Sequence, residues 1–267
     1  MKRSIYLAMM AAALALATAP GWARSPRPKS PQATDTARGA TAVIDPDAIA
    51  ALNRMGDYLR TLKTFQVRAS TSTDDVLEDG EKIQYEANTD YLAQLPNRLR
   101  VEMTADDLHR VYLYDGKNLT VLAVLLNYYA TVPAPATVGE LMEELDEKYD
   151  IELPLVDLFY WGGPKSGIDK IKSATVIGPS TVEGTTCEQY AFRQDGLDWQ
   201  VWIQLGDYPL PRKLVLTTLT DEARPQHIAV LTWNLAPSFN EATFTFDPPT
   251  GARKIVLAAA DAGSGNR

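Results

Sequence analysis

The stretch Thr243–Ala252 reads Thr-Phe-Thr-Phe-Asp-Pro-Pro-Thr-Gly-Ala, and its pattern predicts the last strand of a β-sheet. Phe244 and Phe246 lie two residues apart, so on an extended strand both rings would point to one face. The β-branched Thr243 and Thr245 would take the other face. The Asp-Pro-Pro sequence that follows would end the strand, because a proline cannot donate a hydrogen bond to a neighbouring strand. By itself, the pattern indicates only an edge strand followed by a turn.

Two runs of expected strands precede this stretch, and each has turn signals at nearly even spacing. In the first run, the pairs Asp79-Gly80 and Asp115-Gly116 mark hairpin turns of an antiparallel meander. Its strands are expected at Phe65–Thr71, Ile83–Leu92, Arg98–Met103, His109–Tyr114 and Leu119–Leu126. The second run is expected at Ala174–Ile177, Cys187–Arg193, Trp199–Gln204, Arg212–Leu219 and His227–Trp233. Strands at this spacing indicate a barrel or a strongly curved sheet.

Three helical segments interrupt the strand pattern. The first is expected at Asp45–Thr64, where the aspartate is a suitable N-cap and Pro46 a suitable first helical residue. The second is expected at Thr137–Tyr149, whose first and fourth residues have capping-box spacing, and a short apolar helix is expected at Leu155–Trp161. Three segments cannot cover a large sheet on both faces, so we expect them to cover one face or to cap an open concavity. The expected fold class is therefore a β-rich α+β fold built on a curved antiparallel sheet.

The N-terminus reads as a secretory signal peptide, Met1–Ala23. Lys2 and Arg3 precede the apolar run Ile5–Ala17, whose 13 residues are short for a membrane span, since a span needs about 20. Small residues predict cleavage after Ala23. The alternative is a retained N-terminal anchor. No other run reaches spanning length, so we expect no transmembrane span in the mature chain.

The remainder of the chain divides by composition. Residues 24–44 are rich in proline, serine, threonine and alanine, and we expect a disordered linker because they cannot bury enough surface to order themselves. Residues 45–257 have a length acceptable for one β-rich domain. Residues 258–267 are expected to form a flexible tail.

The balance of charges is acidic, with 26 basic and 34 acidic residues and a net charge of −8. An acidic domain repels phosphate backbones, which argues against a nucleic-acid partner. The same charge disfavours tight binding to anionic lipid surfaces. Cys187 is the only cysteine, so no intramolecular disulfide can form even in an oxidising compartment. It is expected to act as a small buried hydrophobe.

Residues suited to enzyme chemistry are sparse. His109 and His227 are the only histidines, and a lone histidine in a strand is more often structural than catalytic. The sequence has no Gly-x-Ser-x-Gly elbow, no glycine-rich phosphate loop and no recognisable zinc motif. The acidic cluster Glu143–Glu147 reads as a solvated helix face rather than as paired catalytic carboxylates. We therefore expect no enzyme activity, no catalytic residue, no metal and no cofactor.

The apolar residues are more informative. Val121–Leu126 is apolar on both faces of a strand, and Trp199 and Val201 share a face opposite to Trp202. Any one of these residues is explained by an ordinary packed core. Together, strands that are apolar on both faces need cover on both, or one face must line a cavity. Such a cavity could accept an acyl chain, which gains about 0.8 kcal/mol per buried methylene.

These considerations select two sets of candidate binding residues. The candidates for the cavity lining are Val121, Val124, Leu126, Trp199, Val201, Trp202 and Leu216. The candidates for a helical lid are Leu141, Leu145, Leu158 and Phe159. The sequence does not decide which strand face points inward, because one step of register inverts the set.

Several stretches resemble, in the same order along the chain, the LolA/LolB-like periplasmic lipoprotein carriers. After an N-terminal amphipathic helix, Leu95–Arg100 places a proline-asparagine step before an apolar strand. Asp115–Leu119 is similar to the carriers' aspartate-glycine-lysine hairpin, and Phe244–Ala252 to their closing strand. The sequence is closer still to a set of predicted periplasmic proteins, the domain-of-unknown-function family 2092.

The resemblance spans most of residues 45–257 and implies a half-barrel of antiparallel strands with helices covering its concave mouth. In the carriers this cavity binds lipoprotein acyl chains, so the resemblance implies a periplasmic protein whose partner is a hydrophobic ligand or a lipoprotein. In the lipoprotein carrier, an arginine immediately before the proline-asparagine step helps to latch the lid. This chain has Leu95 there, so no charged latch is expected at that position.

The sequence is compatible with two functions. The first is a periplasmic protein that binds a lipid or a lipoprotein acyl chain, as a carrier or a chaperone. The second is an envelope sensor or interaction module that recognises a protein partner through the same groove. Bound lipid in the purified protein would favour the first, and a crosslinked envelope protein without lipid would favour the second. A hydrolase would need an activity that depends on His109 and His227.

Overall fold

Both runs of expected strands belong to one open sheet of twelve strands in the computed structural model, which describes residues 43–260. In chain order the strands are β1 (Thr64–Val76), β2 (Lys82–Gln94), β3 (Arg98–Thr104), β4 (His109–Tyr114), β5 (Asn118–Ala123), β6 (Tyr128–Pro133), β7 (Ser173–Val182), β8 (Thr185–Gln194), β9 (Leu197–Gln204), β10 (Pro211–Thr218), β11 (Gln226–Asn234) and β12 (Arg253–Lys254). The helices are α1 (Pro46–Thr61), α2 (Val138–Tyr149) and α3 (Asp157–Tyr160), with 3-10 turns η1 (Ile168–Lys170) and η2 (Glu241–Thr243). Every strand expected before residue 240 is present, some with different bounds.

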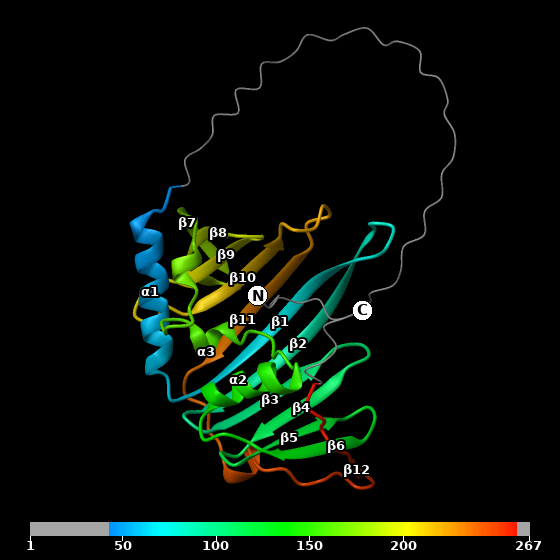
Figure 1. The fold of residues 1–267 in the computed structure, drawn as a ribbon. Coiled ribbons are helices and arrows are strands. Elements are labelled where there is room, and N and C mark those ends of the chain that lie inside the picture. Colours follow the sequence, from blue (N-terminus) through cyan, green and yellow to red (C-terminus); the bar gives the residue numbers. More distant parts are fainter. Residues whose placement is uncertain (1–42, 261–267) are drawn as a thin grey trace, which may run out of the picture. The chain divides into compact units, whose positions relative to one another are not determined.

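The order of the strands across the sheet is β12-β6-β5-β4-β3-β2-β1-β11-β10-β9-β8-β7. Strands β1 to β6 form one antiparallel meander and β7 to β11 form a second (Figure 1). The meanders join in the middle of the sheet, where β1 pairs antiparallel with β11 and Val67 lies opposite Trp233. One edge strand is β7, and the other is the short β12, which runs parallel to β6.

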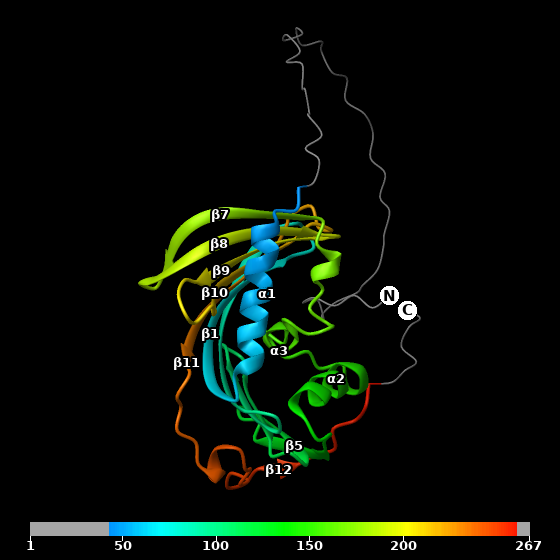
Figure 2. The ribbon, with the colours of Figure 1, turned by 90° about the vertical axis from the view of Figure 1, so that its left-hand side faces the viewer.

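The sheet is curved, and the three α-helices lie on its concave side (Figure 2). Helix α1 packs beside β7 and against α3, while α2 lies nearer to the strands of the first meander (Figures 1 and 2). This arrangement confirms the expected β-rich α+β fold, in which a curved antiparallel sheet forms a half-barrel and helices cover its concave face. The segment between the two meanders supplies α2 and α3, so the chain covers its own sheet.

Both long helices begin where local chemistry predicted. The Asp45 carboxylate accepts a hydrogen bond from the Asp47 backbone N–H at 2.9 Å, and Pro46 occupies the first helical position. At the start of α2, the Thr137 hydroxyl accepts from the Glu140 N–H, and the Glu140 carboxylate accepts from the Thr137 N–H. This reciprocal pair is the expected capping box.

The strand expected within Thr243–Ala252 is absent, and this prediction was wrong. Turn η2 forms instead, because the Asn240 side chain accepts a hydrogen bond from the backbone N–H three residues later, at 3.0 Å. Phe244 is buried at the end of this turn, whereas the Phe246 ring contacts the Tyr129 ring at a centroid distance of 4.9 Å. The two rings that suggested one face of a strand therefore have different partners.

The strand expected at Leu119–Leu126 ends earlier, at Ala123. Asn127 adopts a φ of 55°, a left-handed conformation that asparagine tolerates better than most residues. Its backbone N–H donates to the Val124 carbonyl at 3.1 Å and closes a tight turn. The turn returns the chain into β6, a strand that the sequence pattern did not predict.

The expected signal peptide, the linker up to residue 42 and the tail from residue 261 lie outside the described residues. The last two linker residues are described and lie beside β7, where the Ala174 N–H donates to the Val43 carbonyl at 3.1 Å. At the other end, the Ala260 N–H donates to the Lys148 carbonyl of α2 at 2.8 Å. Both described ends of the chain are therefore hydrogen-bonded to the fold, one to β7 and the other to α2.

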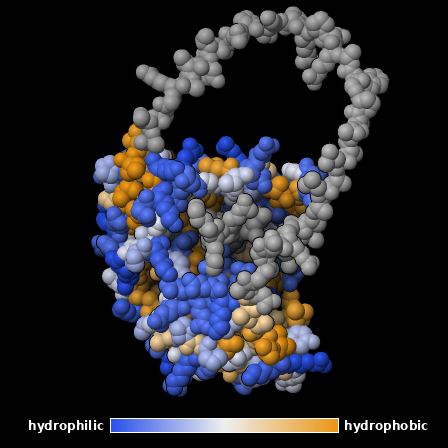
Figure 3. All heavy atoms as spheres, viewed as in Figure 1, coloured by the Kyte–Doolittle hydropathy of each residue, from blue (hydrophilic) through white to orange (hydrophobic). Residues whose placement is uncertain are grey.

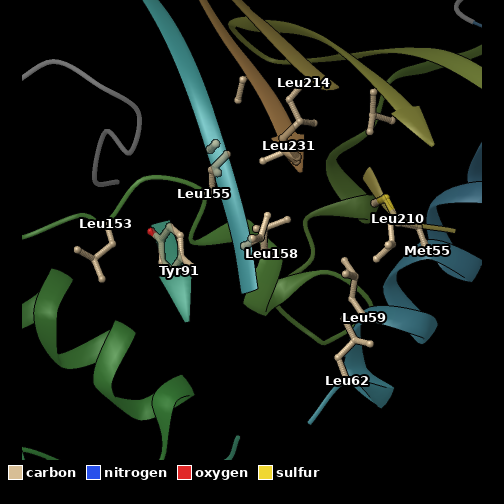
Figure 4. Close-up of a cluster of buried hydrophobic side chains, with 14 of the residues drawn as sticks. Met55, Leu59, Leu62, Tyr91, Leu153, Leu155, Leu158, Leu210, Leu214 and Leu231 are labelled. Carbon is tan, nitrogen blue, oxygen red and sulfur yellow. The ribbon is translucent and has the colours of Figure 1, made fainter. Parts of the chain in front are cut away.

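One continuous cluster of buried side chains joins the concave face to the helices. Tyr91, Leu214 and Leu231 enter it from the sheet, and Met55 and Leu59 enter it from α1 (Figure 4). Full burial of one such aliphatic side chain contributes about 1.5–3 kcal/mol. This cluster is therefore the main source of stability, and every helix takes part in it.

Two smaller apolar clusters lie on the convex side. The cluster under the β7–β8 hairpin consists of Val182, Cys187, Trp202 and Val215, with Ile228 and Val230 packed against it. The cluster behind β4 and β5 consists of Val111, Leu113 and Leu122, with Val124, Tyr129 and Phe246 packed against it. Cys187 is buried, as expected of a small hydrophobe. Apolar side chains on the concave face of the strands therefore pack in the large cluster with the helices, and those on the convex face pack in the two smaller clusters.

Asp74 joins the β1–β2 hairpin to β11. Its carboxylate accepts hydrogen bonds from the Gln226 backbone N–H at 3.1 Å and from the Lys82 and Gln84 side chains at 3.2 Å each. Partial burial pushes the pKa of Asp74 upward, but these bonds outweigh that effect and hold the pKa below its ordinary value of 3.8. The stabilisation by Asp74 is therefore complete above that ordinary value and is lost as pH falls through the lower pKa of the folded state.

We expect Asp74→Asn to lower the free energy of unfolding by about 1 kcal/mol at neutral pH, because a charged acceptor of three bonds is lost. The difference from the parent protein should shrink as the pH is lowered and the parent carboxylate takes up a proton. Urea unfolding at neutral and acidic pH measures both effects. The neighbouring, exposed Asp75→Asn is the matched control, and a loss at Asp74 that does not depend on pH would contradict the assignment.

Candidate functional site

The concave face brings together several residues expected to line a cavity. Val201 of β9 is fully buried, and Trp199 of the same strand lies opposite Leu216 of β10. The Trp199 ring stacks on the Phe192 ring of β8 at a centroid distance of 4.3 Å. Val121 of β5 joins the same cluster from the other meander. These residues belong to one apolar surface that extends across both halves of the sheet.

The residues expected to form a lid pack on this apolar surface. We call residues 138–163, which comprise α2, α3 and the segments that join and follow them, the lid. Its candidate residues all enter the concave cluster, and they are Leu141, Leu145, Leu158 and Phe159. The Phe159 ring lies 6.2 Å from the Phe65 ring of β1 and 6.1 Å from the Tyr91 ring of β2, measured between centroids. The lid thus packs on the strands at the centre of the sheet.

Three other cavity candidates lie elsewhere. Leu126 is exposed at the tip of the β5–β6 turn, and Val124 in the same turn packs into the convex cluster behind β4 and β5. Trp202 alternates with Val201 along β9 and therefore faces the convex side. Val124 and Leu126 lie outside the strand because β5 ends at Ala123. Trp202 lies in the strand but faces the convex side, because successive side chains of a strand point to opposite faces. None of the three contributes to the concave cluster.

The convex surface around Trp202 forms a shallow groove of about 380 Å³. The indole N–H of Trp202 donates to the Ser180 hydroxyl at 3.1 Å, and the Lys213 ammonium lies 4.9 Å from the centre of the indole ring. The groove is also lined by Thr181, Val182, Glu183, Gln189 and Val230. These contacts give Trp202 a structural role on the outer face.

Two tyrosine hydroxyls of the sheet donate hydrogen bonds to the lid and to the segment just before it. The hydroxyl of Tyr91, a fully buried residue of β2, donates to the carbonyl of Pro154 in the lid. The hydroxyl of Tyr114, on β4, donates at 2.6 Å to the carbonyl of Pro135, just before α2 begins. Leu95, at the position where the carriers have an arginine, packs partly buried against the concave cluster. Sequence reasoning did not identify either tyrosine.

A backbone contact fastens the lid to α1. Gly56 of α1 and Gly162 at the end of the lid touch so closely that a Cβ atom on Gly56 would lie 2.5 Å from the Gly162 nitrogen. A Cβ atom on Gly162 would lie 2.6 Å from the Gly56 carbonyl carbon. Only residues without a side chain allow this approach. An isolated glycine inside a helix pattern was the one sequence signal for it.

The lid contains a strained residue next to the Tyr91 bond. Leu155 has a φ of 58°, and its side chain is nevertheless buried in the concave cluster. A left-handed conformation costs a residue other than glycine roughly 1–2 kcal/mol. Packing of the leucine side chain offsets this cost in the closed lid.

Burial shifts the pKa of three titratable groups near the concave face. His227 is buried on β11, its Nδ1 lies 2.7 Å from the Thr73 hydroxyl, and burial lowers its pKa. Burial raises the pKa of Tyr190 on β8, whose hydroxyl donates to the Glu188 carboxylate at 2.7 Å. Asp157, at the start of α3, is accessible to solvent, but the protein around it desolvates its carboxyl and raises the pKa.

The two histidines, which are the residues considered for catalysis, lie on different strands and on different faces of the sheet. His109 lies on the convex side, where its Nε2 is 2.8 Å from the Glu102 carboxylate, whereas His227 lies on the concave side. Within residues 43–260, no cluster of three or more histidine, cysteine, aspartate or glutamate side chains could hold a metal ion.

None of the helices within residues 43–260 combines the length and the hydropathy that crossing a bilayer would require.

Solved structures of similar fold include several proteins at low sequence identity. One is the lipoprotein LppX from Mycobacterium tuberculosis, with 12% identity and a TM-score of 0.45 over 73% of this chain and 100% of that chain. Another is an uncharacterised conserved protein from Thermus thermophilus, with 13% identity and a TM-score of 0.44 over 79% and 99%. A third is a LolA superfamily protein from Nitrosomonas europaea, with 8% identity and a TM-score of 0.35 over 74% and 97%.

A comparison with curated proteins gave no match. A family model described as "Predicted periplasmic protein (DUF2092)" matches residues 48–258, from the first turn of α1 to beyond β12. The match therefore spans the sheet, its helical lid and the closing stretch. The chain belongs to this family of predicted periplasmic proteins, DUF2092.

Proposed function

We propose that this protein binds an apolar ligand, the acyl chain of a lipid or of a lipoprotein, between the concave face of its sheet and its lid, and shields that ligand in the periplasm. The single observation that carries the proposal is the continuous apolar surface of the concave face, which the lid covers and to which the Tyr91 hydroxyl fastens it. An acyl chain cannot cross an aqueous compartment unshielded.

The attachment of the lid supports reversible opening. The ion pairs of α2, Lys148–Glu144 and Lys165–Glu143, join residues of the lid to each other or to the segment just beyond it, and neither reaches a strand. Opening therefore breaks hydrogen bonds such as the one from Tyr91 and exposes apolar side chains, but it leaves these two ion pairs intact. An entering acyl chain replaces the apolar contacts that opening removes.

The free energy lost when the lid opens is similar in size to the free energy gained when an acyl chain is buried. Exposing Leu141, Leu145 or Leu158 costs about 1.5–3 kcal/mol each. A chain of about 16 carbons gains on the order of 10 kcal/mol on burial, before ordering costs, at 0.8 kcal/mol per methylene. The ligand can therefore compensate for displacement of the lid without binding irreversibly. That balance suits a protein that must both accept and release a lipid.

Native mass spectrometry of protein exported to the periplasm and purified without detergent tests the proposal. We expect masses of bound lipid on the parent protein. Val121→Trp and Leu216→Trp fill the concave side, so each should reduce the lipid-bound fraction by about tenfold, for an overpacking cost of 1–3 kcal/mol. Ile177→Trp, on the exposed edge strand β7, is the matched control and should retain the parent's lipid content.

Circular dichroism of each variant separates loss of binding from loss of folding. Parent protein that carries no lipid, and that acquires none from added lipid, would contradict the proposal. A bound peptide or a crosslinked envelope protein in place of lipid would instead favour a sensor that uses the same concave surface.

A further inference from the structure

The edge of the sheet next to β6 exposes large apolar side chains. Leu125 and Leu126, at the tip of the β5–β6 turn, are 60% and 69% exposed, and Ile255 and Val256, directly after β12, are 49% and 88% exposed. We call these four residues the edge patch. Figure 3 shows hydrophobic surface at the lower right of the molecule, where Figure 1 places β6 and β12.

Backbone hydrogen bonds hold β12 and the residues after it beside the start of β6, the strand that follows the turn with Leu125 and Leu126. The Arg253 N–H donates to the Asn127 carbonyl at 2.9 Å, immediately after the β5–β6 turn. The Ile255 N–H donates to the Tyr129 carbonyl at 2.8 Å. Tyr129 also packs on Phe246 in the convex cluster, which includes Val124 of the turn. The turn and the segment after β12 are therefore both attached to this cluster. The exposed side chains are therefore presented by an ordered edge.

Two exposed basic residues lie beside the edge patch. Arg253 and Lys254 are exposed, and neither forms a salt bridge with another residue of the described part. Residues 116–136 and 248–260 contain no aspartate or glutamate, and the acidic residues beside them include Asp247 and the exposed Asp106 and Asp107 of the β3–β4 turn. By contrast, the β1–β2 hairpin tip, which exposes Leu77, is surrounded by acidic side chains at residues 78, 79 and 81. Exposed apolar and basic groups coincide at the edge patch.

The remaining chain offers no apolar cover for this patch after export. Residues 24–42 and 261–267 contain no large apolar residue. A partner with both an apolar layer and negative charge therefore fits the edge patch best. A phospholipid bilayer supplies both, because apolar side chains can enter the boundary between head groups and acyl chains while cations contact the phosphates.

We propose that the edge patch docks this protein on the surface of a phospholipid bilayer that contains anionic lipid. The apolar side chains of Leu125, Leu126, Ile255 and Val256 enter the interface, and Arg253 and Lys254 contact the lipid phosphates. The net charge of −8 opposes such binding, so it is local, weak and reversible rather than tight. Docking at this edge does not depend on whether the concave face holds a lipid.

Sedimentation with vesicles tests the docking surface, using protein purified from the periplasm. The vesicles contain phosphatidylethanolamine with phosphatidylglycerol, and a second set contains phosphatidylcholine alone. We expect binding to the first set that weakens at high salt. The double variant Leu125→Ser/Leu126→Ser should lower the partition coefficient by about tenfold, and Arg253→Gln/Lys254→Gln should remove the salt dependence and the preference for anionic lipid.

The matched control is Ile177→Ser/Leu205→Ser, which removes side chains of comparable exposure, 54% and 47%, away from this edge. It should bind vesicles as the parent does. Parent protein that stays in solution, or edge variants that sediment like the parent, would overturn the proposal. So would a concentration-dependent dimer that the leucine variant abolishes, since the occupant would then be a second copy. Native mass spectrometry of the edge variants reports bound lipid separately, so failure here is distinguishable from failure of the proposed function.

Discussion

Gly56→Ala is expected to lower the free energy of unfolding by about 1–3 kcal/mol, the range for forcing an added methyl group into a well-packed site. The added Cβ would lie 2.5 Å from the nitrogen of Gly162 and 2.7 Å from its Cα, which are both backbone atoms. A flexible side chain could move aside, but the backbone at the end of the lid cannot move without separating from α1. We therefore expect the loss to arise from displacement of the lid.

Gly139→Ala is the matched control, because it adds the same methyl group to the other long helix. A Cβ atom on Gly139 would meet nothing within 4 Å, and the residue is exposed. Alanine is up to about 1 kcal/mol more favourable than glycine in a helix, so this variant should be as stable as the parent or more stable. Urea unfolding measures both variants. Equal effects of the two substitutions would contradict the close contact between Gly56 and Gly162.

The helices and most strands could be predicted because their signals are local. The aspartate before Pro46 and the capping box at Thr137 are complete within four residues, and the structure shows both caps. The closing stretch lacked such a signal for its conformation. An alternation of four residues fits a strand, but Asn240 just before it caps a 3-10 turn, and that capping pattern was the better guide.

The candidate site could be predicted in part. Strand alternation correctly separates Trp202 from Trp199 and Val201, but only the curvature of the assembled sheet shows which face is concave. Leu126 was misplaced because the β5–β6 turn depends on one asparagine in a left-handed conformation. Contacts between distant segments, such as Tyr91 with Pro154, leave no pattern in the sequence around either residue. These contacts fasten the lid, so the way in which the lid is attached to the sheet could not be predicted from the sequence alone.

Tyr91→Phe is expected to loosen the lid while leaving the sheet folded. The substitution keeps the ring, which packs 6.1 Å from the Phe159 ring, and removes only the hydroxyl that donates to the Pro154 carbonyl. A lost hydrogen bond with an acceptor left behind costs about 1–3 kcal/mol. Pro154, which accepts this bond, directly precedes Leu155, so the bond holds the sheet to the part of the lid that contains the left-handed residue.

Hydrogen exchange of the lid amides measures this effect, because it reports local opening apart from global unfolding. Exchange at the N–H groups of Leu158 and Trp161, which bond within the lid, should accelerate about tenfold, the equivalent of 1.4 kcal/mol. Amides of β9 should not change. Tyr85→Phe, an exposed tyrosine on the same strand and the same face, is the matched control and should leave lid exchange unaltered. Uniform acceleration throughout the protein would show that the Tyr91 hydroxyl supports the whole fold rather than the closed lid. Acceleration confined to the lid, together with faster loss of bound lipid, would identify this neutral bond as the latch that sets how readily the concave face opens.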